Sequence, residues 1–154
     1  MRVGQMQDRV PAQFDDGAEL ISEVGAAMCT ALDQGNAVVL IAIGTHRQLL
    51  ETELSVRGID IVEALGTGQY VSLDALETRS AIIIDGSLDV IRFAEVIGAP
   101  IDRAAEQHGC VLIFGDLVPL MYADGQHTGV VELESLWRAF LASRPVFLDC
   151  QCLR

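Results

Sequence analysis

Apolar residues fall into continuous runs and helical periods that alternate along the chain. The runs at 37–43 and 111–114 are typical of parallel strands buried on both faces. Shorter apolar segments at 70–73 and 146–150 predict two further strands. Between them, apolar residues recur every three or four positions, which predicts helices near 18–34, 47–56, 89–108, 117–123 and 130–142. The pattern predicts an α/β fold with a mainly parallel sheet of about five strands and helices on both faces.

Several segments are less clear. Residues 59–65 are ambiguous and fit a short helix before a turn at 66–68. Residues 75–85 fit a helix by the spacing of their apolar positions and a strand by their three consecutive isoleucines. Pro100 predicts an interruption or kink in the helix around it. The polar residues 1–16 predict a loose N-terminal segment, followed by a single domain over 17–154.

The segment 111–122, VLIFGDLVPLMY, contains the first candidate site. Gly115 predicts a sharp turn after the strand, and Pro119 falls in the first turn of the next helix. Asp116 is placed to cap that helix. It also falls at the carboxyl end of a buried strand, where open α/β sheets bind ligands. Asp116 therefore has two interpretations: a helix cap, or a carboxylate that holds a ligand or orients His46.

Polar residues also follow the other predicted strands at the same edge. His46 ends the predicted turn 44–46 and either faces solvent at a helix start or contacts a ligand. Arg47 could meet an anion at the helix N-terminus, and Asp74 ends the second strand. A phosphate-binding loop needs several glycines and a lysine, and this turn has neither. ATP hydrolysis by the ordinary route is therefore not expected.

Composition excludes several function classes. The formal net charge of -12, with arginine the only basic residue besides histidine, disfavours nucleic acids and anionic membranes. No apolar run approaches a membrane span and the N-terminus lacks a signal-peptide core, so we expect a cytoplasmic protein. The four cysteines fit small buried residues better than a redox or metal role, and a redox role of Cys150 and Cys152, which could share a strand face, stays open. No catalytic triad or metal-ligand spacing is present, so we expect neither an enzyme nor a metal or other cofactor.

Short motifs follow one another in order along 37–150. They are AVVLIAI with Thr45-His46-Arg47, Arg57-Gly58-Ile59-Asp60, Gly68-Gln69-Tyr70-Val71, Leu73-Asp74-Ala75 with Glu77-Thr78, Asp85-Gly86 before Phe93, Phe114-Gly115-Asp116-Leu117-Val118, Leu133-Glu134 with Leu136-Trp137, and Arg144-Pro145 before Leu148 and Cys150. In these motifs the chain resembles the MEDS domain, the methanogen/methylotroph sensory domain first described in dichloromethane-responsive regulators.

The resemblance implies a RecA/KaiC-like fold without a phosphate loop and a helix over 75–85. It implies a non-enzymatic sensory domain that binds a small molecule and signals through a protein partner such as a kinase, transcription regulator or sigma-factor regulator. Asp116 stands where the family has Glu. Tyr122 and Trp137, at aromatic positions of the family, join His46, Arg47, Asp74 and Asp116 as candidate ligand contacts.

Two other functions stay open: a protein-interaction adaptor or antagonist with no ligand, and a degenerate nucleotide-binding protein. A homodimer is a further expectation, on general grounds for a small acidic domain.

Overall fold

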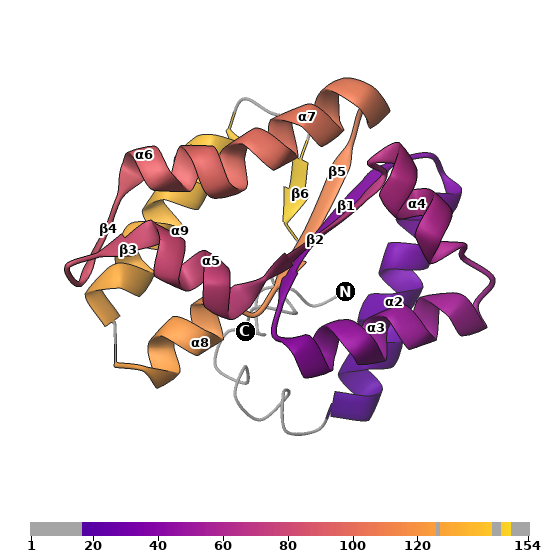
Figure 1. The fold of residues 1–154 in the computed structure, drawn as a ribbon, viewed down its shortest axis with the longest axis horizontal. Helices are drawn as coiled ribbons and strands as arrows, with labels where there is room; N and C mark the ends of the chain where they lie inside the picture. The colour runs from indigo at the N-terminus through magenta and orange to yellow at the C-terminus, as the bar shows by residue number, and fades with distance from the viewer. Residues whose placement is uncertain (1–16, 126, 143–145, 149–154) are drawn as a thin grey trace.

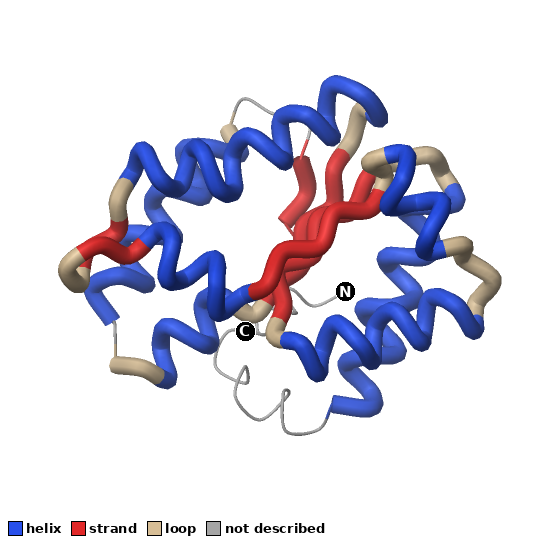
Figure 2. The backbone as a smooth tube through the Cα atoms, in the orientation of Figure 1, coloured by secondary structure: helices blue, strands red, loops and turns tan. Residues whose placement is uncertain are grey.

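A parallel β-sheet with helices on both faces forms the centre of the molecule (Figures 1 and 2). The computed structural model describes residues 17–125, 127–142 and 146–148. The sheet has four strands in the order β2-β1-β5-β6. The α/β class and the parallel sheet are thus confirmed, although the described residues give this sheet four strands where about five were expected. The strands are β1 Ala37–Ala42, β2 Tyr70–Asp74, β5 Val111–Gly115 and β6 Val146–Leu148.

Strand β1 lies inside the sheet and is buried along its whole length. Successive side chains of a strand point to opposite faces, so β1 contributes to two cores. The first core includes Ala37, Val39 and Ile41. The second includes Val38, Leu40 and Ala42. The continuous apolar run in the sequence therefore predicted this strand correctly.

Three helices cover the face that carries the second core (Figure 1). The turn expected at 44–46 is wrong, because Gly44 already begins a helix and these residues form its first turn. The short helix considered for 59–65 is confirmed in a slightly later position, and Gly68 ends it with a φ of 79°. These helices are α2 Gly17–Asp33, α3 Gly44–Val56 and α4 Ile61–Thr67.

The opposite face is covered by a longer series of helices, which packs on the first core (Figure 1). Helix α8 agrees with its expected bounds, whereas α9 begins at His127 rather than at residue 130. The elements are α5 Ala75–Ile82, α6 Val90–Phe93, the π-helix η2 Ala94–Gly98, α7 Ala99–His108, α8 Leu117–Ala123 and α9 His127–Leu141.

The conflict over 75–85 is resolved by a division of the segment. The helix continues to Ile82, and the next isoleucines pair as β3 Ile83–Ile84 with β4 Ser87–Leu88. Asp85 and Gly86 join the two strands with φ values of 52° and 80°. Positive φ at both central positions is characteristic of a tight hairpin turn, and Asp-Gly is among the pairs that adopt it most readily.

Pro100 shapes the helix around it without ending it. Proline removes one backbone N–H and clashes with the carbonyl four residues earlier, which is that of Val96. The backbone accommodates this as the π-helix Ala94–Gly98, and Pro100 then lies in the first turn of α7. The predicted interruption is therefore present as a local change of helix type, a known cause of helix irregularity.

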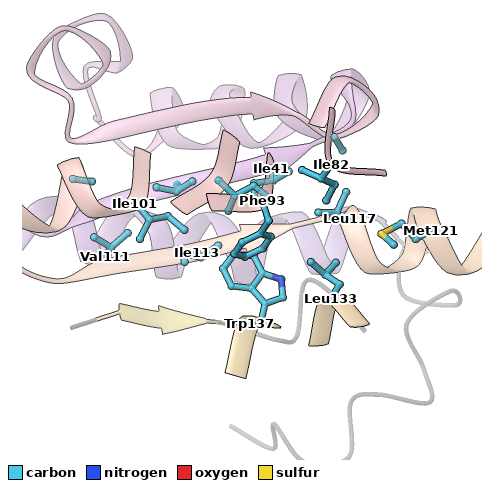
Figure 3. Close-up of a cluster of buried hydrophobic side chains, with 14 of the residues drawn as sticks. Ile41, Ile82, Phe93, Ile101, Val111, Ile113, Leu117, Met121, Leu133 and Trp137 are labelled. Carbon is cyan, nitrogen blue, oxygen red and sulfur yellow. The ribbon is translucent and has the colours of Figure 1, made fainter. Parts of the chain in front are cut away.

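An aromatic group fills the core between α6 and α9. Trp137 is 4% exposed, and its ring meets Phe93 edge-to-face with centroids 5.3 Å apart (Figure 3). Phe140 completes the group at 6.2 Å from Trp137. Edge-to-face contacts add to the stability that apolar burial provides. Trp137, which the resemblance made a candidate ligand contact, is therefore a residue of the hydrophobic core.

Some predictions lie outside the described residues. These are the loose segment 1–16 and the last two positions of the strand expected over 146–150, whose first three positions form β6. Cys150 and Cys152 also lie outside the described residues. Cys29 and Cys110 are described as free, half-buried thiols.

Candidate functional site

Asp116 lies where the two interior strands end. A sharp turn was expected at Gly115. Instead, Gly115 is the last residue of β5 and is paired with Ile41. The N–H of Asp116 continues this pairing and donates to the Ile41 carbonyl at 2.7 Å. Asp116 is consequently held against the end of β1 and is 6% exposed.

The Asp116 carboxylate turns towards β1 and α3. Its Oδ2 atom accepts a hydrogen bond from the Ile43 N–H at 2.8 Å and lies 2.9 Å from Nδ1 of His46. It makes no side-chain bond to the start of α8. The interpretation of Asp116 as the cap of α8 is therefore wrong, and the alternative that it orients His46 agrees with the geometry.

This contact fixes how the imidazole is held. A carboxylate can only accept hydrogen bonds, so Nδ1 of His46 must carry the proton that it shares with Asp116. In the neutral ring, Nε2 is then the nitrogen with the lone pair. The His46 side chain is 18% exposed and that of Asp116 is 9% exposed, so the pair lies at the boundary between solvent and interior.

The connection between β1 and α3 is very short. β1 ends at Ala42 and α3 begins at Gly44, which leaves Ile43 alone between them. A phosphate-binding loop needs a longer glycine-rich segment whose N–H groups surround the phosphates. The predicted lack of this loop is thus explained by the backbone, and the N–H of Ile43 is already bound to Asp116.

Arg47 and Asp74 lie near the same edge with different roles. Arg47 is exposed in the second turn of α3. Asp74 is paired with Ala42 at the end of β2, and its carboxylate accepts from the Glu77 N–H at 2.9 Å. Asp74 therefore caps α5, which is the role that the sequence suggested for Asp116.

The two aromatic candidates are not part of the polar pair. Tyr122 is 56% exposed on α8, and its ring stacks on His127 with centroids 4.5 Å apart. Trp137 belongs to the core, as described above. Near the carboxyl ends of β1 and β5, Trp137 borders a small cavity.

That cavity is apolar and has a volume of about 10 Å³. This is about the space that one water molecule needs, so no organic ligand fits without movement of the walls. Leu117 and Val118 at the start of α8 form one side of it. The complete lining is Ile41, Ile113, Phe114, Gly115, Leu117, Val118 and Trp137.

A second polar contact was not predicted. The Tyr70 hydroxyl donates to Glu51 Oε2 at 2.8 Å, and Tyr70 is only 1% exposed. Burial, followed by the hydrogen bond and the charge of Glu51, raises the pKa of Tyr70 well above its usual value. Glu51 lies one helical turn after Arg47, but nothing in the sequence links this face of α3 to β2.

No family model, curated protein or solved structure matches the chain. The fold and the site define an α/β protein with a parallel sheet and a His–Asp pair at the carboxyl edge. The MEDS resemblance and the cytoplasmic location stay predictions.

The described part of the chain lacks two further features. No three His, Cys, Asp or Glu side chains there are grouped as metal ligands. None of its helices combines the length and the apolar character that a bilayer span requires.

Proposed function

We propose that this chain is a non-enzymatic regulatory domain that binds a small molecule at the His46–Asp116 pair and signals through a protein partner. The observation that supports it is the placement of Asp116, buried at the carboxyl edge of the sheet and shared between the Ile43 N–H and His46. Burying a carboxylate is costly, and a cap for α8 would not require it. Open α/β sheets bind ligands at this edge.

The pair is also placed to transmit a signal. His46 lies in the first turn of α3, so a ligand that contacts its imidazole acts on the start of that helix. Helix α3 packs closely on α2, where Glu53 leaves room only for a glycine at position 25. A shift of α3 would therefore move α2 as well, since packed helices transmit strain.

The RecA/KaiC-like and MEDS relationships form part of this proposal. The parallel sheet, the helices on both faces and the absence of room for a phosphate loop support them. The short β1–α3 connection speaks against the degenerate nucleotide-binding alternative, because it offers few free N–H groups to a phosphate.

An adaptor without a ligand is the second candidate. It is favoured by the cavity that Trp137 borders, whose volume of about 10 Å³ leaves no room for an organic molecule at that point. It is also favoured by exposed apolar side chains far from His46, including Ile91 at 70% and Val131 at 65%.

A thermal-shift screen of small organic molecules, with native mass spectrometry of protein purified from its host, tests the leading proposal. We expect a compound that raises the melting temperature of the wild type but not of His46→Gln or Asp116→Asn. His108→Gln is the matched control, because His108 contacts the Thr67 carbonyl at the opposite end of the sheet. If no compound stabilises the protein and no small molecule is retained, the adaptor function replaces ligand sensing.

A further inference from the structure

One end of the molecule exposes apolar side chains from three elements. The β3–β4 hairpin leads directly into α6, and the Leu88 N–H donates to Glu132 Oε1 at 3.4 Å, which places the start of α9 beside the hairpin (Figure 1). The exposed fractions are 39% for Ile84, 60% for Val90, 70% for Ile91 and 65% for Val131. We call these four side chains the hairpin-end surface.

The fold holds this surface in place. The Asp89 N–H donates to the Ile82 carbonyl at 2.8 Å, and the Asp89 carboxylate caps α6 by accepting from the Arg92 N–H at 3.0 Å. Val90 and Ile91 follow this anchor directly and point outward while Phe93 enters the core. Apolar groups that are fixed before binding lose little entropy when a partner covers them.

The charges around the surface indicate what covers it. Asp85, Glu95, Glu132 and Glu134 are exposed next to these apolar side chains or one helical turn away from them. They outnumber the exposed basic residues of the same elements, which are Arg92 beside Ile91 and Arg138 further along α9. A second copy would bring two acidic rims together, and each chain carries a net charge of -12. A basic partner has the complementary charge.

We propose that the hairpin-end surface binds a partner protein through a basic segment with apolar side chains, the arginines or lysines facing the acidic rim. The proposal rests on the proposed function only in assuming that a protein partner exists. It makes no use of His46 or of a ligand.

The test selects partners by chemistry. Random peptides displayed on phage are selected against the folded wild-type chain, and enriched peptides are synthesised and titrated by fluorescence anisotropy. We expect enriched peptides with net positive charge and apolar residues, and binding that weakens as salt is added. Ile91→Ala and Val131→Ala remove apolar contacts without adding charge to the acidic rim, and each should weaken binding on the order of tenfold, as truncations at central contacts do.

Val62→Ala provides a closely matched control. Val62 and Ile91 are both the second residue of a helix capped by an aspartate, and both are exposed, at 80% and 70%. Val62 lies on the opposite side of the sheet, so its substitution should leave peptide binding unchanged. Circular dichroism melting curves check that all three variants fold.

Several outcomes would overturn the proposal. They are enrichment of acidic or neutral peptides, no saturable enrichment, equal weakening by Val62→Ala, or light scattering that shows a dimer broken by Ile91→Ala. A failed ligand screen leaves these measurements unaffected, so the two proposals can fail separately.

Discussion

The Asp116→Ala variant tests whether the carboxylate is a buried double acceptor or a helix cap. The substitution removes two contacts of Oδ2, at 2.8 Å to the Ile43 N–H and at 2.9 Å to His46 Nδ1. Each hydrogen bond to a charged group contributes about 1.5 kcal/mol or more, so we expect a loss of about 3 kcal/mol. A lost cap would cost only about 1 kcal/mol.

The assay is equilibrium unfolding in urea, followed by the fluorescence of Trp137, the single tryptophan, which is 4% exposed in the folded state. Asp60→Ala is the reference, because the Asp60 carboxylate caps α4 by accepting from the Glu63 N–H at 3.1 Å. It should cost about 1 kcal/mol.

Two further variants separate the contacts. Asp116→Asn keeps an oxygen for the Ile43 N–H and should recover about half of the loss. A cycle that combines Asp116→Ala with His46→Ala should give a coupling energy of about 1 kcal/mol. If Asp116→Ala costs no more than Asp60→Ala, or if the coupling is absent, the reasoning about the buried pair is refuted.

Three other predictions follow from local geometry. Gly25→Ala should destabilise the protein in the same urea assay despite the higher helix propensity of alanine, because its Cβ would lie 2.5 Å from the Glu53 Cγ. Gly66→Ala has open space around it and should stabilise the protein by about 0.5–1 kcal/mol. Trp137→Ala removes the fluorescent probe, so its unfolding in urea is followed by circular dichroism; the substitution should cost about 3–5 kcal/mol through the cavity it leaves, and a cost below about 1 kcal/mol would contradict its core role. Because the pKa of Tyr70 is raised in the folded state, the Tyr70 hydroxyl loses its proton first in the unfolded state. The contribution of Tyr70 to stability is therefore complete below pH 10 and is lost as the pH rises further. Tyr70→Phe should flatten this alkaline loss in pH-dependent unfolding, and an unchanged pH profile would count against it.

Several local features could be predicted because they depend on neighbouring residues. The run AVVLIAI predicted the interior strand, since a short apolar run rich in β-branched residues is typical of a strand covered on both faces. Asp85 and Gly86 form a hairpin turn that their own φ preferences favour, so this turn too depends on neighbouring residues alone.

Other local predictions were wrong because tertiary contacts decided between possible structures. Gly44 was expected in a turn, yet it begins α3, whose first turn is held by the Ile43 and His46 contacts with Asp116. The irregularity predicted at Pro100, by contrast, is present, but as a π-helical turn rather than a helix end, because this helix packs on the core along its length.

The sequence by itself determined the α/β class, the interior strand and the absence of a phosphate loop, because these follow from apolar patterns and from residue types within short segments. The tertiary structure decided what the Asp116 carboxylate binds. Its partners lie 73 and 70 residues away in the chain, at Ile43 and His46, whereas the cap that it was expected to form needs only the next turn of helix. The parallel pairing of β1 with β5 brings these distant residues together, and no local pattern carries that information.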